Sequence, residues 1–405
     1  MSRVIGEQTT TDAAAREARH LYPTYRRPDR VFERGSGWIL KDSEGREYVD
    51  LLGGIAVNAL GHAHPRIARA IADQAGRLLH CSNLFRHPLQ GILAERLARL
   101  SGLPRVFLCN SGSEAVEAGI KVARALARAR GETSRTDLVA LEGSFHGRTC
   151  GALSVTSEES YRAPFGPLLQ GVRFVPPEDA CALRDAVGPR TAAVLMEPIQ
   201  GEGGVRCLSA SYLAAAREAC DAAGALLLFD EVQCGLGRTG RWFAFQESDV
   251  LPDLICVAKP LAAGLPLGAL LGREETAAVL GPGSHGSTFG GGALACRAAL
   301  EFLDVVEEEG LVERVRQTGE RALSAFRGLA ARNPALREVR GRGLMIGLEI
   351  DRPAAPLVDA LLARGFIVGS CRGQVIRLLP PYAVPPEVLE QFADVLGGLL
   401  IGESI

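Results

Sequence analysis

The sequence of 405 residues has no hydrophobic run long enough to span a membrane. A membrane helix needs about 18 uninterrupted apolar residues, and no segment provides them. The first twelve residues also lack the apolar run behind a basic cluster that marks a secretory signal. We therefore expect a soluble, cytoplasmic protein with no membrane partner.

The sequence also lacks an excess of charge of either sign. Lysine and arginine number 45, aspartate and glutamate number 47, and the formal net charge is −2. Such a chain has no overall basic field that could hold a nucleic acid or an anionic membrane. The expected partners are therefore small-molecule substrates, and a nucleic acid is not among them.

Paired cysteines and metal-binding clusters are missing as well. None of the ten cysteines forms a Cys-x-x-Cys pair, and several lie inside apolar runs, so we expect buried thiols in a reducing compartment. His62 and His64 have the spacing of a metal-ligand pair, but no acidic residue follows nearby to complete a site. We expect no metal.

Five short apolar runs are present and have the character of buried strands. Stretches with a helical pattern lie between them, notably 114–130 and 211–223. This alternation predicts an α/β fold with a mostly parallel central sheet flanked by helices. The predicted strands are Arg105–Cys109, Asp137–Leu141, Ala193–Met196, Ala225–Phe229 and Leu254–Val257.

The two ends of the chain have a different texture from the middle. Residues 22–50 resemble short strands and turns, and the chain from Leu300 onward resembles a long amphipathic helix, a Gly341–Gly343 turn, short strands and a final helix. We expect a large domain over 56–300. A smaller α+β domain would combine 1–55 with 301–405.

A polar or glycine-rich segment follows each of the five predicted strands. Ligands of open α/β sheets bind at the carboxyl ends of the strands, so we expect one pocket rimmed by all five segments. Ser111, Gly112 and Ser113 follow the first strand and open a helix, which makes an anion site from free N–H groups and hydroxyls. A plain helix cap with Ser113 as the N-cap is the alternative.

Two charged residues stand at the ends of buried strands. Asp230 follows Leu226–Phe229, where an ionised carboxylate is costly unless it is paired. A protonated pyridine nitrogen would be a suitable partner, and a structural salt bridge or N-cap is the alternative. Lys259 ends another apolar strand, where a lowered pKa of its amine would favour Schiff-base chemistry. A solvated surface charge is the alternative role.

These residues lie in long motifs that resemble one family. Glu197–Gly204, Asp230–Gly240 and His285–Gly291 carry the resemblance, together with Gly53–His62 and Arg377–Pro381. In these motifs the chain is similar to the class III, ornithine-type aminotransferases. The resemblance implies the fold type I of pyridoxal-phosphate-dependent transferases and runs nearly from end to end.

The resemblance implies how pyridoxal 5'-phosphate would be held. Phe145 and Val232 would lie on the two faces of the pyridine ring, and Asp230 would pair with its nitrogen. Lys259 would form the Schiff base and then carry the proton. Thr288 would reach the phosphate in the neighbouring subunit, which makes a homodimer with shared sites. The full implied set is Ser111, Gly112, Ser113, Phe145, Asp230, Val232, Gln233, Lys259 and Thr288.

The same resemblance implies the substrate contacts. Arg148 would grip a substrate carboxylate, because a planar bidentate fork suits that task. Glu202 would mask Arg377 while a terminal-amine donor is bound and release it for glutamate or 2-oxoglutarate. Tyr25, and Ser287 beside Thr288, would lie near the substrate.

The implied reaction moves the terminal amino group of N2-acetyl-L-ornithine to 2-oxoglutarate. Succinylornithine, ornithine, 4-aminobutyrate and carrier-linked lysine remain alternative donors, because contacts to the far end of the donor cannot be identified in the sequence. An aminomutase and a non-catalytic scaffold or sensor are more distant alternatives. Two-substrate transamination is favoured over an aminomutase by Arg148 and by the pair of Glu202 and Arg377. A non-catalytic scaffold or sensor is opposed by the intact Lys259 and Asp230.

Overall fold

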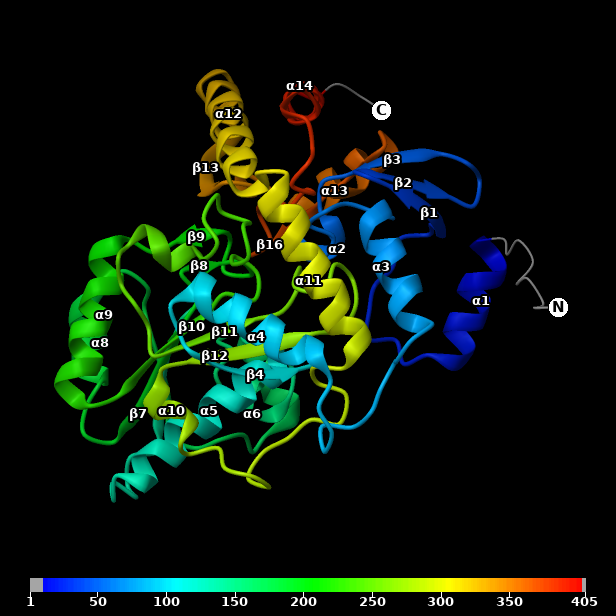
Figure 1. Ribbon diagram of the computed structural model, residues 1–405. Helices are drawn as coiled ribbons and strands as arrows, with labels where there is room; N and C mark the ends of the chain where they lie inside the picture. The colour runs from blue at the N-terminus through cyan, green and yellow to red at the C-terminus, as the bar shows by residue number, and fades with distance from the viewer. Residues whose placement is uncertain (1–9, 403–405) are drawn as a thin grey trace.

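The computed structural model describes residues 10–402 and is built around a seven-stranded sheet (Figure 1). The strand order is β4-β12-β11-β10-β7-β5-β6, and only the two pairs that β12 forms are antiparallel. The predicted α/β fold with a mostly parallel sheet is therefore confirmed. The strands are β4 (Arg105–Cys109), β5 (Asp137–Leu141), β6 (Val172–Val175), β7 (Thr191–Met196), β10 (Leu226–Asp230), β11 (Leu254–Val257) and β12 (Gly268–Gly272).

All five predicted strands are present, and each agrees with the prediction to within two residues at either end. The prediction missed β6 and β12. Strand β12 begins and ends with glycine, a residue that weakens strands and gives the segment the look of a loop. Strand β6 is a partly exposed four-residue edge strand and lacks the continuous apolar run that marked the others.

Strand β10 shows why the central strands are apolar throughout. Its alternate residues Leu226 and Leu228 belong to the core on one face of the sheet, and Leu227 and Phe229 belong to the core on the other. A parallel strand covered on both faces has no solvent side, so polar residues are excluded until the strand ends. The first polar side chain of β10 is that of its last residue, Asp230.

Helices cover both faces of the sheet. Helix α5 packs on one face and α4 and α9 on the other. Helix α5 approaches β10 closely at Gly119, where an added Cβ would lie 2.4 Å from Leu228 Cδ1. The helices of this region are α3 (Pro65–Ala75), α4 (Pro88–Ser101), α5 (Gly112–Ala129), α6 (Cys150–Ser154), α7 (Glu159–Arg162), α8 (Ala180–Ala186), α9 (Ala210–Ala223), α10 (Glu274–Ala277) and α11 (Ala293–Glu308).

Both ends of the chain fold beside each other (Figure 1). Strand β15 pairs in parallel with β3, so residues more than 300 positions apart share a sheet. This pairing supports the proposed small domain from both chain ends; its residues 1–9 and 403–405 lie outside the described residues. The first sheet has β1 (Phe32–Ser36), β2 (Ile39–Asp42), β3 (Glu47–Asp50) and β15 (Phe366–Ile367); the second has β13 (Leu336–Arg342), β14 (Met345–Ile350), β16 (Gly369–Cys371) and β17 (Val375–Leu378).

The single long helix expected from Leu300 is wrong. Helix α11 begins at Ala293 and ends at Glu308, and α12 begins at Leu311. Gly310 between them has φ of 60°, a conformation that glycine adopts without steric cost and that ends the first helix. The remaining elements are α1 (Thr10–His20), α2 (Gly53–Ala56), α12 (Leu311–Arg332), α13 (Ala354–Ala363), α14 (Pro386–Leu400), the hairpin β8 (Ile199–Gln200) and β9 (Arg206–Cys207), and the 3₁₀ turns Ala163–Phe165 and Ala244–Glu247.

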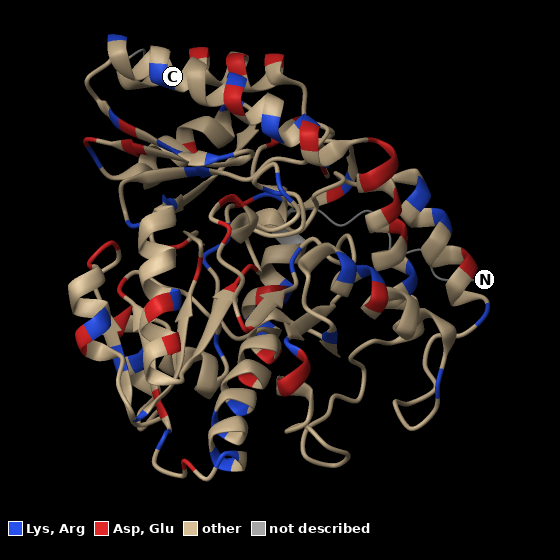
Figure 2. Cartoon of the chain, turned by 60° about the vertical axis from the view of Figure 1, so that its left-hand side comes forward, with Lys and Arg blue, Asp and Glu red and all other residues tan. Residues whose placement is uncertain are grey.

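Charged residues of both signs are scattered along the outer helices, and the strands at the middle of the molecule carry few (Figure 2). The mixture of signs agrees with the nearly equal totals of 45 basic and 47 acidic residues. Over residues 10–402, no helix is both long and apolar enough to cross a membrane.

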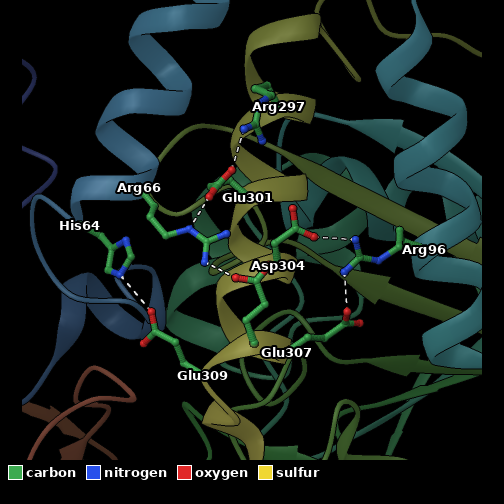
Figure 3. A network of polar contacts seen from close by, with 9 residues as sticks. His64, Arg66, Arg96, Arg297, Glu301, Asp304, Glu307 and Glu309 are labelled. Carbon is green, nitrogen blue, oxygen red and sulfur yellow. Dashed lines mark hydrogen bonds and ion pairs between the residues drawn. The ribbon is translucent and has the colours of Figure 1, made fainter.

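A network of ion pairs holds α11 to α3 and α4 (Figure 3). Arg66 on α3 donates to Glu301 at 2.6 Å and to Glu308 at 2.6 Å. Arg297 donates to the second oxygen of Glu301 at 2.6 Å, and Arg96 on α4 pairs with two further acids of α11. The Glu301 side chain is 10% exposed, so it is the enclosed member of this network, whereas Glu308 is 62% exposed.

We predict that Glu301→Gln destabilises the fold far more than Glu308→Gln. Burial raises the pKa of Glu301, but hydrogen bonds from Arg66 and Arg297 outweigh burial and lower it. Loss of the charge should reduce the free energy of unfolding by about 1–3 kcal/mol, against about 0.5 kcal/mol or less for the exposed Glu308.

Urea unfolding at several pH values checks this prediction. Because the folded pKa of Glu301 is lowered, its contribution is complete above its ordinary pKa of 4.5 and is lost as the pH falls through the folded value. The difference between wild type and Glu301→Gln should therefore shrink at acidic pH. Equal losses in the two variants at pH 7 would contradict the assignment.

Candidate active site

A cavity of about 350 Å³ lies at the carboxyl ends of the central strands, and we call it the strand-end cavity. Segments that follow β4, β5, β7, β10 and β11 all contribute to it, as expected for an open α/β sheet. Its lining residues are Val57, Asn110, Ser111, Gly112, Ser113, Phe145, His146, Gly147, Glu197, Asp230, Val232, Gln233, Ala258, Lys259, Gly264, Leu265, Pro266 and Leu267.

The start of helix α5 forms one wall of the strand-end cavity. Ser111 is the N-cap, and its Oγ accepts from Glu114 N at 3.2 Å, so the alternative that made Ser113 the N-cap is wrong. Ser113 Oγ accepts instead from Arg148 N at 3.3 Å. A Cβ at Gly112 would lie 2.8 Å from both methyl groups of Val232, so only glycine lets the helix start approach that side chain. The exposed N–H groups of such a first turn suit an anion.

Asp230 lies at the floor of the cavity and is compensated by two donors. Its Oδ2 is 2.8 Å from His146 Nδ1, and its Oδ1 accepts from Val232 N at 3.0 Å. Burial disfavours a charged His146, but the hydrogen bond and charge of Asp230 outweigh burial and raise its pKa. His146 Nε2 has no partner among the described residues, so the ring is aligned by Asp230 alone.

Glu197 is a buried acid that the sequence did not single out. Its two oxygens accept from Phe145 N at 3.1 Å and from Gly201 N at 3.3 Å. Burial raises the pKa of Glu197 to about 7, Asp230 adds to the rise, and His146 opposes it. The signal in the sequence was its position directly after β7, equivalent to that of Asp230 at the end of β10.

Lys259 lies after β11 and lines the strand-end cavity. The chain turns directly beyond it, since Leu261 N donates to Ala258 O at 2.7 Å. Burial lowers the pKa of Lys259 from 10.5 to about 8, and the positive charge of Arg377 acts in the same direction. Far more of the amine is therefore uncharged near neutral pH than for an ordinary lysine, and this form can act as a nucleophile or base.

Glu202 and Arg377 meet although 175 positions separate them in the sequence. Arg377 Nη1 donates to Glu202 Oε1 at 2.5 Å and to Gln233 Oε1 at 3.3 Å. Arg377 lies on β17, in the sheet that also contains β13, β14 and β16, and Glu202 lies in the turn after β8. The Glu202 side chain is 33% exposed and Arg377 only 4%, so the arginine is the enclosed partner.

Arg148 is held by aromatic rings. Its Cζ lies 3.8 Å from the Tyr161 ring centroid and 5.5 Å from that of Phe145. The two rings pack edge to face, with centroids 6.4 Å apart and an interplanar angle of 89°. Tyr161 therefore supports both side chains. Sequence reasoning missed it, because a tyrosine on a four-residue helix has no distinctive pattern.

Six predicted substrate or cofactor residues do not line the strand-end cavity. Three of them, Arg148, Glu202 and Arg377, are described above, and the others are Tyr25, Ser287 and Thr288. Tyr25 is 74% exposed and contacts Arg27, whose Cζ is 5.5 Å from the ring. Thr288 is exposed beside Phe289 and lines a separate small crevice. Ser287 borders the cavity through its Oγ, which accepts from Asn110 Nδ2 at 2.9 Å.

His62 and His64 are occupied by single acidic partners. His62 Nε2 is 2.7 Å from Asp50 Oδ2, and His64 Nε2 is 4.0 Å from Glu309 Oε1. In the part of the chain that the structure describes, no group of three histidine, cysteine or acidic side chains could hold a metal ion.

We predict that Lys259 of the cofactor-free protein reacts with a small amine-reactive label, and that the extent of labelling has its pH midpoint near pH 8. Arg377→Gln should raise that midpoint, because removal of a neighbouring positive charge favours the protonated amine. Labelling over a pH series with peptide mapping measures both, and the exposed Lys41 serves as an internal reference. A wild-type midpoint above pH 10 would contradict the described environment of Lys259.

Solved structures share this fold. An ornithine aminotransferase from Toxoplasma gondii has a TM-score of 0.93 and 34% identity, covering 97% of this chain and 95% of that one. An acetylornithine aminotransferase from Elizabethkingia anophelis has a TM-score of 0.87 and 30% identity, covering 97% and 99%.

Curated sequences are similar over nearly the full length. The acetylornithine aminotransferase of Methanosarcina mazei is 44% identical over 382 residues, 94% of each chain. The mitochondrial acetylornithine aminotransferase of Alnus glutinosa is 46% identical over 93% of this chain and 85% of its own. The family profile of aminotransferase class III matches residues 22–400. The chain therefore belongs to the class III aminotransferases and is a pyridoxal-phosphate-dependent transaminase.

Proposed function

We propose that this enzyme moves the δ-amino group of N2-acetyl-L-ornithine to 2-oxoglutarate. The products are N-acetylglutamate 5-semialdehyde and glutamate, and the reaction belongs to arginine biosynthesis. The observation that carries the proposal is the Glu202 and Arg377 ion pair of 2.5 Å facing Lys259, with Arg148 as a second carboxylate-binding arginine. Relatives named acetylornithine aminotransferase support this choice of donor.

The strand-end cavity fits the cofactor. The first turn of α5 offers N–H donors for a phosphate, and Gly112 keeps that turn free of a side chain. Phe145 and Val232 would contact the two faces of the ring, and Asp230 would pair with its nitrogen. Ser111, Ser113 and Gln233 complete the binding set. When bound, the cofactor supplies an electron sink for the carbon that loses a proton.

Lys259 is proposed to hold the cofactor and to act as the base. Its lowered pKa leaves the amine partly uncharged, so Lys259 Nζ can take the proton from the substrate carbon that bears the terminal amine and return it. Asp230 would face the ring nitrogen while His146 Nδ1 and Val232 N contact the carboxylate from the protein side.

Two arginines serve the two substrates. Arg148 would bind the α-carboxylate of the donor and the side-chain carboxylate of glutamate or 2-oxoglutarate. Arg377 would bind the α-carboxylate of glutamate only after Glu202 swings away, because the ion pair occupies its Nη1. Tyr25 and Ser287 would complete the substrate contacts.

A homodimer with shared sites is part of the proposal. Large apolar side chains are exposed around Thr288, including Phe289 at 68%, Leu84 at 88% and Phe85 at 68%. Asn83 joins the two segments, donating to Ser287 O at 2.8 Å and to Gly290 O at 3.0 Å. Such a surface suits burial against a second copy, where Thr288 would reach the neighbouring cofactor. An active monomer in sedimentation would contradict this assembly.

We propose that the enzyme works in the cytoplasm. All ten cysteines are unpaired, and six of them are buried, as a reducing compartment permits.

We predict that borohydride reduction of the purified enzyme fixes the cofactor to Lys259. We also predict that acetylornithine is the best amine donor in a panel assayed with 2-oxoglutarate. The panel includes N-succinylornithine, ornithine, 4-aminobutyrate and lysine, and glutamate formation is measured. Peptide mapping of the adduct to another residue would contradict the role of Lys259. A higher kcat/KM for ornithine than for acetylornithine would replace the proposed donor.

Glu202→Ala and Arg377→Ala should separate the two half-reactions. Without Glu202, Arg377 is permanently free. Glutamate needs a free Arg377 and acetylornithine does not, so the acetylornithine half-reaction should slow more than the glutamate half-reaction. Arg377→Ala should do the reverse, and Arg148→Ala should impair both. A lost charge-assisted contact is worth about 1.5–3 kcal/mol, roughly a ten- to hundred-fold change in rate.

Single-turnover spectra of each half-reaction measure these effects. Glu202→Gln, which keeps the size but not the charge, is the matched control and should resemble Glu202→Ala. Equal losses in both half-reactions for Glu202→Ala would remove the switch from the mechanism and leave the family assignment intact.

A further inference from the structure

A second cavity, of about 270 Å³, shares Phe145 with the strand-end cavity. We call it the Tyr161 cavity. Four parts of the chain enclose it: the segment after β5, the region of α7, the turn after β8, and the hairpin of β16 and β17. Its lining residues are Gly143, Ser144, Phe145, Glu158, Tyr161, Glu202, Ser370, Cys371, Arg372 and Gly373.

The Tyr161 cavity lies between the two carboxylate-binding arginines of the proposed function. On one side, the Tyr161 ring is 3.8 Å from Arg148 Cζ. On the other, Glu202 accepts from Arg377 at 2.5 Å. The cavity is smaller than the roughly 300–1,000 Å³ that whole small-molecule ligands occupy. It therefore suits one substituent of a substrate and not a complete ligand.

The lining offers polar groups without protein partners. Ser370 and Arg372 are both exposed, and their side chains make no hydrogen bond or ion pair with another residue in 10–402. Glu158 lies opposite and accepts from Ser160 N at 3.4 Å and from Ser160 Oγ at 2.9 Å. A hydroxyl and a guanidinium that lack protein acceptors can donate to a carbonyl or carboxylate of a ligand.

We propose that the Tyr161 cavity is the subsite for the N-acyl group of the amine donor, which rests on the proposed function. The acylated nitrogen and the carboxylate share one carbon of the donor. If Arg148 holds the carboxylate, the acyl group falls beside the ring that packs on Arg148. The acyl carbonyl accepts from Arg372, and Ser370 Oγ is the second donor.

A binding experiment isolates the subsite from the chemistry. N-acetyl-L-norvaline carries the carboxylate and the acyl group but no terminal amine, whereas pentanoate carries the carboxylate alone. Calorimetric titration of the cofactor-loaded enzyme should give N-acetyl-L-norvaline at least a tenfold lower Kd. Arg372→Ala, which removes the donor, and Ser370→Phe, which fills the cavity, should each bring the ratio of the two Kd values close to one.

Arg337→Ala is the matched control. Arg337 is an exposed arginine on β13 that does not line the cavity, so its loss should leave the ratio at the wild-type value. If Arg372→Ala and Ser370→Phe both keep the wild-type ratio, the subsite is wrong. A ratio that falls equally in Arg337→Ala would also overturn it.

Turnover separates this inference from the donor assignment. If the wild type transfers amino groups from other amines but from no N-acylated one, the proposed donor and its subsite both fail. If acetylornithine is a good donor while Arg372→Ala and Ser370→Phe keep the wild-type kcat/KM ratio of acetylornithine to ornithine, only the subsite fails. A fall of that ratio in both variants, with Arg337→Ala unchanged, supports the subsite.

Discussion

The buried carboxylate of Asp230 is the interaction on which the rest of the site depends. An ionised carboxylate at a buried strand end costs several kcal/mol unless donors compensate it. His146 and the amide of Val232 supply that compensation at 2.8 and 3.0 Å. The same charge opposes the lowering of the Lys259 pKa and adds to the raised pKa of Glu197. Four elements that end at one sheet edge are thus coupled electrostatically through one side chain.

The central sheet and the sheet that contains β17 contribute different things to the site. The strand ends place Asp230 and Lys259 on well-packed, buried backbone, which suits groups that must keep a fixed geometry at the reacting atoms. Arg377 comes from the small sheet and is held by Glu202, a partly exposed side chain. An ion pair at the edge of the site can open without disturbing the strands, and this is what a site with two differently shaped substrates requires.

Choice among donors depends on a different set of residues from the chemistry. In the proposed function, the residues around Lys259 act on the carbon that bears the terminal amine. They do not distinguish donors by their far ends. In the proposed function, that far end would meet Arg148, whose side chain packs on Tyr161, and Tyr161 in turn packs on Phe145. The hairpin of β16 and β17, which carries Arg372, lines the Tyr161 cavity beside these rings. Members of one family can therefore share the chemistry and differ in substrate at this edge.

The sequence by itself determined five of the seven strands of the central sheet, the position of Asp230 and Lys259 at the ends of two of them, and the family. Apolar runs and the polar residues that follow them are local patterns. Only the tertiary structure decided that His146 aligns Asp230, that Glu197 is a raised-pKa acid, and that β12 enters the sheet antiparallel. It also showed the contact of Tyr161 with Arg148. These features arise from burial and from contacts between segments distant in the chain, which no local periodicity encodes.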